Sequence, residues 1–249
     1  MSPTHPVLQR LDDLAAHLSI RPDVLAVLGV GSVGEQTERV DEHSDVDVFV
    51  VVDDGAVGRY AHDVAWLEAV APVAFWFPHT HDGCKVLFDD GVFVEFAVFT
   101  RAELRAVPFA GARVVWQRDD APDDLLRGAA PPLPRDDSVA LHLGEALTNL
   151  LVGVHRELRG EHLTAARFVQ SHAVDHVLAL AGTHERRDPF DASRRVEQAH
   201  PDLPLAAMVP GYGRSAAAAR EVLTWLGARY DVPAGIAGRL EELLERAGA

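Results

Sequence analysis

Two aspartates at the start of an apolar run are the residues of this chain best suited to chemistry. Asp45-Val46-Asp47 opens the run Val48 to Val52. In a β-strand, side chains two residues apart point the same way, so the two carboxylates would share one face. Neighbouring carboxylates repel each other, and a bound cation removes that cost. Their hard oxygen ligands suit Mg²⁺, which binds through one or two carboxylates together with substrate phosphates.

A glycine turn upstream supplies the second half of such a site. The strand predicted from Val24 ends in Gly29-Val30-Gly31-Ser32, and twelve residues separate Ser32 from Asp45. Glycine lets the backbone approach a phosphate closely, and backbone N–H groups with a serine hydroxyl bind anionic oxygens. We therefore predict two strands joined by a polar loop. Arg39 in that loop is a further phosphate candidate because its guanidinium fork suits phosphate; the alternative is a solvated loop residue.

A third acid lies on a predicted hairpin. Lys85 to Phe88 and Val92 to Phe99 flank Asp89-Asp90-Gly91, and Asp-Gly between two β-rich runs favours a tight turn. Glu95 is the one charged residue in the second arm, VFVEFAVF. A buried, unpaired carboxylate is costly, so Glu95 needs either a cation or an opening to solvent. The alternative is an outward-facing residue on an edge strand.

The elements that would position these residues follow from periodicity. Apolar residues at helical spacing predict helices over 5–19 and 57–70, and Thr100-x-x-Glu103 predicts a capped helical start. Short β-rich runs predict strands over 73–77 and 114–116. Together with the hairpin and the two motif strands, these elements predict a mixed sheet with flanking helices.

The pattern changes in the second half of the chain. The proline-rich segment 119–135 is predicted to be a linker. Apolar residues then recur every three or four positions over 138–180, 214–229 and 235–246, which predicts an antiparallel helical bundle. We therefore expect an α+β protein with two domains, a catalytic sheet domain over 1–130 and an α-helical substrate-binding domain over 131–249.

Composition excludes several classes of function. The 249 residues carry a net charge of −15, and Lys85 is the single lysine. A nucleic-acid binder normally presents a basic surface, so nucleic acid is not an expected partner. No run approaches the ~20 apolar residues that span a bilayer, and the N-terminus lacks a signal pattern, so we expect no membrane association and a cytoplasmic location. The single cysteine, Cys84, allows no intrachain disulfide.

The motif Gly31-Ser32, twelve residues, then Asp45-Val46-Asp47, with Ser44 before the first aspartate, resembles the signature of the polymerase-β-type nucleotidyltransferase superfamily. Within it, the chain is most similar to small bacterial enzymes that adenylylate aminoglycoside or lincosamide antibiotics, and so confer antibiotic resistance. The resemblance implies transfer of AMP or another nucleoside monophosphate from ATP or another NTP to a hydroxyl of a small molecule, with pyrophosphate released.

The resemblance also implies roles for individual residues. Asp45, Asp47 and Glu95 would be the catalytic acids and would bind Mg²⁺, in the two-metal form two ions. Gly31 and Ser32 would hold the β- and γ-phosphates. Related enzymes often pair, so a homodimer is compatible with the resemblance.

The helical half offers candidates whose roles stay open. A general base could be Glu95 itself or an acid of the helical half, although each of those acids is equally a solvated helix residue. His172 and His176, one turn apart, could bind a metal or simply pack in the bundle. Arg194 and Arg195 could bind phosphate or pair with neighbouring acids. The acidic base candidates of this half are Glu145, Glu157, Glu161 and Asp175.

Two alternatives to a small-molecule enzyme remain. In the first, the acceptor hydroxyl belongs to a protein, and the chain is an AMP-transferring regulator or antitoxin; such minimal antitoxins are shorter and lack a long helical domain. In the second, the chain keeps the fold and binds nucleotide without catalysis; relatives of that kind usually lose one of the acids, and all of them are present in this chain.

Overall fold

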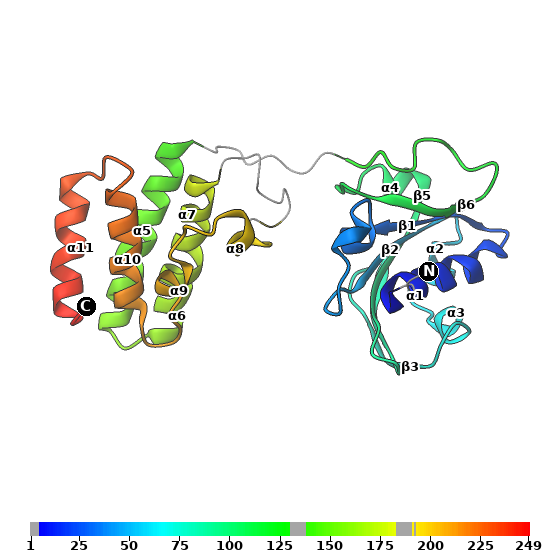
Figure 1. Cartoon of the computed structure of the whole chain (residues 1–249), viewed down its shortest axis with the longest axis horizontal. Coiled ribbons are helices and arrows are strands. Elements are labelled where there is room, and N and C mark those ends of the chain that lie inside the picture. The colour runs from blue at the N-terminus through cyan, green and yellow to red at the C-terminus, as the bar shows by residue number, and fades with distance from the viewer. Residues whose placement is uncertain (1–4, 130–137, 183–190, 192) are drawn as a thin grey trace. The chain divides into compact units, whose positions relative to one another are not determined.

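The computed structural model describes residues 5–129, 138–182, 191 and 193–249. The chain divides into two compact units, Met1–Pro132 and Leu133–Ala249 (Figure 1). We call the first the sheet unit and the second the helical unit, and each is described by itself. The α+β class predicted from the sequence is confirmed, because the first unit combines strands with helices and the described part of the second is helical.

A six-stranded mixed sheet with strand order β3-β4-β5-β2-β1-β6 forms the sheet unit. The neighbours β2 and β5 are parallel, whereas the other neighbouring pairs are antiparallel. The predicted hairpin is β4–β5, with Gly91 at φ 88° in its turn. The predicted strands are confirmed as β1 (Val24–Val30), β2 (Val46–Val52), β3 (Val73–Pro78), β4 (Gly83–Phe88), β5 (Phe93–Thr100) and β6 (Arg113–Gln117).

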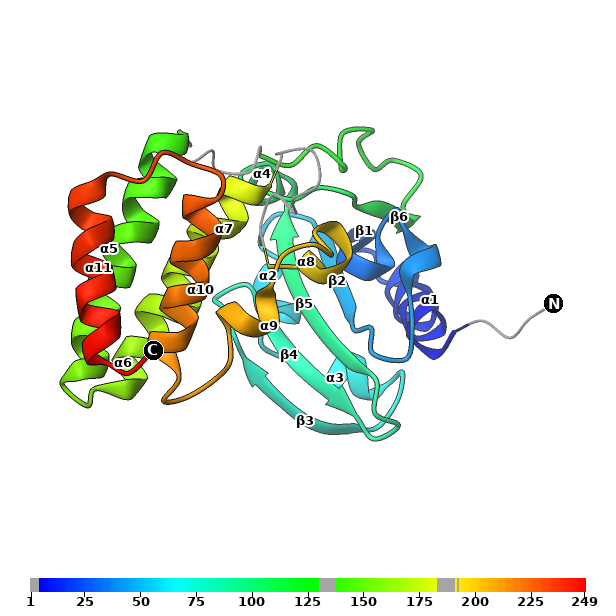
Figure 2. The ribbon, with the colours of Figure 1, turned by 60° about the vertical axis from the view of Figure 1, so that its left-hand side comes forward.

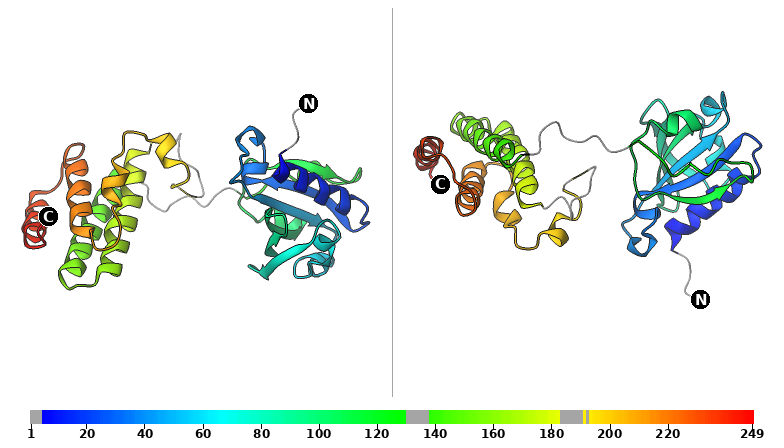
Figure 3. Two further views of the ribbon diagram at one scale, coloured as in Figure 1. Left: turned by 60° about the horizontal axis from the view of Figure 1, so that its bottom comes forward. Right: turned by 90° about the horizontal axis from the view of Figure 1, so that it is seen from above.

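Helix α1 (Pro6–Ser19) covers one face of this sheet (Figure 3). It begins where His5 Nδ1 accepts a hydrogen bond from the Val7 N–H, and Pro6 suits the first helical position because its missing N–H is not needed there. The apolar stripe of α1 is buried against the valines of β2 that alternate with the outward-facing residues. We call this buried face of the sheet the core face.

On the opposite face, a smaller apolar cluster covers the later part of β2, from Phe49 onward, and the later part of β5, from Ala97 onward. The rings of Phe49 and Phe99 meet edge to face at 5.2 Å, and the four-residue helix α4 (Arg101–Leu104) begins with the predicted Thr100–Glu103 capping box. The beginnings of β2 and β5, which carry the candidate acids, lie outside this cluster.

The predicted linker over 119–135 is wrong for its first part. Leu125 is buried in the cluster beneath α4, and Asp124 forms ion pairs with Arg105 and Arg101. Those two guanidinium groups lower the pKa of Asp124 to about 2. Side-chain contacts therefore hold residues 119–129 on the sheet unit, while residues 130–135 lie outside the described residues.

The predicted helix over 57–70 is also wrong. Two short helices, α2 (Val57–Tyr60) and α3 (Ala65–Glu68), stand in its place. The break has a local cause, because the Asp63 side chain accepts a hydrogen bond from the Ala65 N–H and so starts a new turn. Tyr60 is fixed separately, since its hydroxyl donates to Asp23 at 2.6 Å.

The helical unit is a bundle built around α5 (Val139–Leu158). A turn through Gly160, at φ 77°, reverses the chain into a second run that packs antiparallel to α5. Gly153 marks the close approach of the two runs, because a Cβ there would lie 2.4 Å from Cγ2 of Val169. The other elements are α6 (His162–Ala166), the π-helical η3 (Arg167–Ala173), α7 (Val174–Ala181), α8 (Val196–Ala199), α9 (Leu205–Met208), α10 (Ser215–Gly227) and α11 (Ala234–Arg246).

None of the helices in the described residues combines the length and the apolar character that a membrane span requires.

Candidate active site

The predicted acids lie on neighbouring strands. Asp47 of β2 is the register partner of Glu95 on the parallel strand β5, so the two residues are side by side on the sheet. Both face away from the core face, since Val46, Val48 and Val94 alternate with them and are buried. Asp45 precedes β2 by one residue and is partly exposed. The sheet therefore brings Asp47 and Glu95 to one face, beside the entry of Asp45 into β2.

The glycine turn packs directly against these acids. Gly31 opens the 3₁₀ turn η1 (Gly31–Val33) with φ 59°, in the left-handed region that favours glycine. A Cβ on Gly31 would lie 2.3 Å from Oδ2 of Asp47, so no other residue fits there without displacing the carboxylate. Ser32 Oγ donates to the backbone oxygen of Asp45 at 3.1 Å. The two halves of the predicted motif thus form one compact site.

Glu95 has a cationic partner on the next strand. Lys85 of β4 is its register partner, and Lys85 Nζ lies 2.9 Å from Glu95 Oε2. His79 Nε2 lies farther away, 3.9 Å from Oε1. The Glu95 side chain is 38% exposed, so the carboxylate has both a cation and an opening to solvent. Lys85 was missed by sequence reasoning, although a hairpin centred on Asp90 places residues 85 and 95 opposite each other.

Asp45, Asp47 and Glu95 are the carboxylates that could hold a metal ion at this site. Among the described residues, no group of three or more His, Cys, Asp or Glu side chains is arranged to hold a metal ion. The Glu95 carboxylate lies against Lys85 instead, with Nζ 2.9 Å from Oε2. Mg²⁺ needs only one or two carboxylates when substrate phosphates supply the other oxygens. The donor set of Asp45 and Asp47 therefore fits Mg²⁺ bound with a nucleotide.

The two arginines near the site differ in position. Arg39 ends the exposed turn η2 (Thr37–Arg39), and its guanidinium donates to the Gln36 side chain of the same loop. The structure does not bring it onto the acids. Arg113 of β6, which sequence reasoning missed, donates through Nε to the Val33 backbone oxygen at 2.9 Å. Arg113 therefore anchors the glycine turn. In the sequence, the predicted strand over 114–116 was the feature that could have drawn attention to Arg113.

The base candidates of the helical unit divide into two groups. Glu161 forms a local ion pair with Arg156 at 2.8 Å, and Glu157 Oε2 lies 3.1 Å from His162 Nδ1. Asp175, on α7, is exposed, yet desolvation by the surrounding protein raises its pKa. Glu145 of α5 lies close enough to His176 to oppose, without reversing, the lowering of the pKa of that ring by burial and His142.

His176 of α7 has a partner on α5, whereas His172 of η3 does not share it. His142 Nδ1 and His176 Nδ1 are 2.9 Å apart and share a hydrogen bond. Burial, and then the neighbouring His142, lowers the pKa of His176. His172 packs instead against Phe168, with ring centroids 5.6 Å apart. His172 and His176, the predicted metal candidates, are thus not brought together as ligands.

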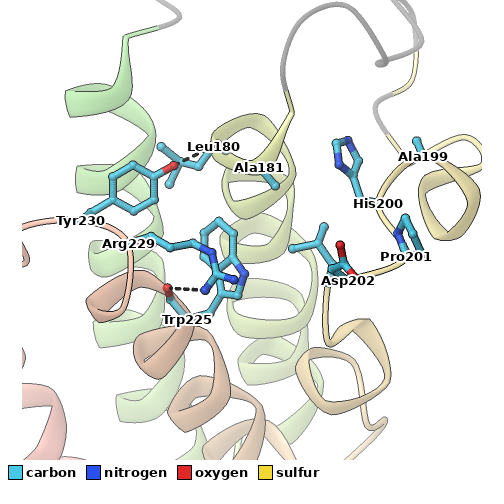
Figure 4. A pocket seen from close by; sticks show the side chains of 10 residues that line it. Leu180, Ala181, Ala199, His200, Pro201, Asp202, Trp225, Arg229 and Tyr230 are labelled. Carbon is cyan, nitrogen blue, oxygen red and sulfur yellow. Dashed lines mark hydrogen bonds between the residues drawn. The ribbon is translucent and has the colours of Figure 1, made fainter.

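A pocket of about 390 Å³ opens on the helical unit (Figure 4). The Arg229 guanidinium lies over the Trp225 ring, 4.6 Å from its centroid, and the Tyr230 hydroxyl donates to the Leu180 oxygen at 2.9 Å. Arg194 and Arg195 lie outside the lining, before α8. The lining is formed by Leu180, Ala181, Ala199, His200, Pro201, Asp202, Leu203, Trp225, Arg229 and Tyr230.

Comparison with known proteins gives matches among solved structures. No family model and no curated protein matches the chain. It is similar to an aminoglycoside 6-adenyltransferase from Bacillus subtilis, with 13% identity, a TM-score of 0.35, and 97% of this chain and 98% of that chain covered. It is also similar to a nucleotidyltransferase-like protein from Exiguobacterium sibiricum, with 13% identity, a TM-score of 0.29, and 97% and 73% covered.

A third similar structure is the Thermotoga maritima CCA-adding enzyme complexed with tRNA, with 12% identity, a TM-score of 0.38, and 99% of this chain and 72% of that chain covered. Because every TM-score is below 0.5 and every identity is 13% or lower, the function has to be argued from the site itself.

Proposed function

We propose that this protein is a Mg²⁺-dependent nucleotidyltransferase that moves AMP, or another nucleoside monophosphate, from an NTP to a hydroxyl group of a small molecule. The observation that carries the proposal is the packing of Gly31 against the carboxylate of Asp47, with Glu95 beside it on the parallel strand. A phosphate-binding turn and metal-binding acids in direct contact are the two components that phosphoryl-type transfer requires.

Each residue has a defined task in this reaction. The N–H groups of the turn at Gly31 and the Ser32 hydroxyl would hold the β- and γ-phosphates, and Asp45 and Asp47 would hold the nucleotide-bound Mg²⁺. A bond forms between the acceptor oxygen and the α-phosphorus, the bond from that phosphorus to the bridging oxygen of pyrophosphate breaks, and the hydroxyl proton leaves to Glu95 or to solvent. When bound, Mg²⁺ supplies charge neutralisation and a lower pKa of the attacking hydroxyl.

The acceptor proposed is an aminoglycoside or a lincosamide. The net charge of −15 favours the approach of a cationic compound, although net charge only steers an encounter. The helical unit is proposed to take part in binding the acceptor, and the pocket beside Trp225 is its candidate for receiving a small molecule. Nucleotide choice between ATP and other NTPs is left to the assay below.

The test is a pyrophosphate-release assay with ATP or GTP against aminoglycosides, lincosamides and simple sugars. We expect Asp47→Asn to lower Mg²⁺-dependent turnover by about 10²–10³-fold, because it removes a negative charge that would hold the Mg²⁺, and without that ion the developing charge of the transferred phosphate would lose its stabilisation. Asp54→Asn is the matched control, since Asp54 is exposed and follows the other end of β2. Circular dichroism should show both variants folded, and unchanged turnover in Asp47→Asn would contradict the proposal.

A second candidate is a nucleotide-binding protein without catalysis. The Lys85–Glu95 ion pair favours it, because a carboxylate occupied by lysine contributes less to a metal site. Calorimetry distinguishes the two functions. Binding of Mg·ATP without pyrophosphate release across the acceptor panel would support this candidate, and release with any acceptor would exclude it.

A further inference from the structure

The row of residues that contains the candidate acids continues across the sheet to its edge. The register places Glu95 beside Lys85 of β4, and Lys85 beside Phe77 of β3. A second row on the same face runs from Phe93 through Leu87 to Phe75. Figure 2 shows β5, β4 and β3 side by side, with β3 outermost. Acids, lysine and aromatic rings thus share one open face of the sheet.

Phe75 and Phe77 form what we call the aromatic shelf. Their side chains are exposed, at 57% and 40%, and their ring centroids lie 5.9 Å apart. Exposed aromatic side chains on an edge strand invite association with other chains, and proteins commonly place charged residues there instead. A solvent-facing aromatic pair in line with a row of charged residues is the composition of a ligand site, with an apolar area and a few polar groups.

The proposed reaction decides which end of the row takes the nucleotide and which end takes the acceptor. This step therefore rests on the proposed function. The attacking and leaving oxygens of phosphoryl-type transfer lie roughly in line with the phosphorus. Gly31 and Ser32, which would hold the leaving pyrophosphate, lie on the β1 side of Asp47. The acceptor hydroxyl must therefore approach from the β5 side, over Glu95. Two strand spacings, about 10 Å, separate Glu95 from Phe77, a length that a disaccharide-sized compound spans.

We infer that the acceptor is an amphiphilic hydroxyl compound whose planar or apolar part stacks on Phe75 and Phe77 while its reacting hydroxyl lies over Glu95. Lys85, between the two ends, would donate to an oxygen of the acceptor. Lys85 opposes a polycation at this position. Of the two proposed acceptor classes, the face therefore favours a lincosamide-like amphiphile over an aminoglycoside.

The experiment uses two acceptors with identical sugars, a phenyl glycoside and the corresponding methyl glycoside. Binding to the full-length protein is measured by ligand-observed NMR in the presence of Mg²⁺ and a non-hydrolysable ATP analogue. We expect the wild type to bind the phenyl glycoside about tenfold more tightly, because ring stacking adds to buried apolar area. Phe75→Ser/Phe77→Ser should abolish that preference.

Trp76→Ser is the matched control. Trp76 belongs to the same strand and is 39% exposed, but its register partner is Val86, so it faces the other side of the sheet. The control should keep the tenfold preference. Equal binding of the two glycosides by the wild type, or a preference that persists in Phe75→Ser/Phe77→Ser, overturns the inference.

Other occupants of the shelf would give different results. A change in the affinity of Phe75→Ser/Phe77→Ser for the ATP analogue would mean that the shelf holds the nucleotide base. A wild-type dimer that becomes a monomer in this variant, by sedimentation velocity, would mean that a second copy covers it. A lower melting temperature in this variant than in Trp76→Ser would mean that the chain itself covers it. Each of these results overturns the inference.

The inference and the proposed function fail separately. If the wild-type protein does not bind the ATP analogue at all, the proposed function is contradicted. Binding of the analogue without a preference for the phenyl glycoside leaves the proposed function standing and removes only the acceptor assignment.

Discussion

Gly31 shows at the scale of one residue how the backbone makes the site. Its left-handed φ of 59° turns the chain out of β1, and its missing side chain leaves the space that the Asp47 carboxylate uses. The same glycine therefore serves the turn and the acid. A substitution there has two costs, one in backbone conformation and one in the position of the carboxylate.

We predict that Gly31→Ala lowers Mg²⁺-dependent pyrophosphate release by about 10²-fold, as expected for a catalytic group moved by about 1 Å. It should also destabilise the fold by about 1–2 kcal/mol, the cost of a left-handed alanine. Urea denaturation measures the second effect. Gly55→Ala is the control, because Gly55 also has a positive φ, of 83°, but a Cβ there meets nothing within 4 Å. Equal losses of turnover in both variants would show that strain alone matters.

At the scale of elements, α5 and α7 are joined by the hydrogen bond between His142 and His176. That bond requires at least one neutral ring. Burial is the largest effect on His176 and keeps its pKa below the ordinary value of 6.5. His142 and His172 also lower this pKa, whereas Glu145 on α5 and Asp175 raise it. The folded helical unit therefore favours the neutral form of His176 more than the unfolded chain does.

This direction sets the expected pH dependence. A histidine whose pKa is lowered by folding contributes full stability above its unfolded pKa and loses it as pH falls below that value. We predict that the melting temperature decreases from pH 7.5 to pH 5.5, and that His176→Gln shows a smaller decrease. His43→Gln serves as control, since the His43 side chain is 83% exposed. A decrease that is the same in all three proteins would contradict a role of His176.

At the scale of the whole molecule, each compact unit has a hydrophobic core of its own. The sheet unit buries the apolar face of α1 against the valines of β2, and the helical unit buries Leu150 among α7, α10 and α11. Apolar burial is the main favourable term in folding, so a defect in one core should act first on the unit that contains it.

We predict that Leu150→Ala destabilises the helical unit by about 2–5 kcal/mol, the usual cost of a core Leu→Ala change. Hydrogen exchange followed by mass spectrometry should show faster exchange in peptides of α5 and α10 and little change in β1, β2 and β5. Leu163→Ala, at a side chain that is 59% exposed, should stay within about 0.5 kcal/mol of the wild type. Faster exchange throughout the sheet would show that the two units unfold together.

The sequence by itself determined the local features of this protein. Alternation of valine and aspartate placed Asp47 on the face opposite the buried valines, the Asp-Gly turn fixed the β4–β5 hairpin, and Thr100 with Glu103 capped α4. These features depend on neighbours within a few residues, and their side-chain chemistry acts at that range. The helical second half followed from periodicity for the same reason.

Only the tertiary structure decided the features that depend on distant contacts. The segment 119–129 reads as a linker until Asp124 meets Arg101 and Arg105, and the position of Tyr60 depends on its hydrogen bond to the distant Asp23. Whether Glu95 had a cation or only solvent depended on its pairing with Lys85 across the hairpin. The strand order then placed Phe77 at the end of that row, because a sheet brings together residues that the sequence separates.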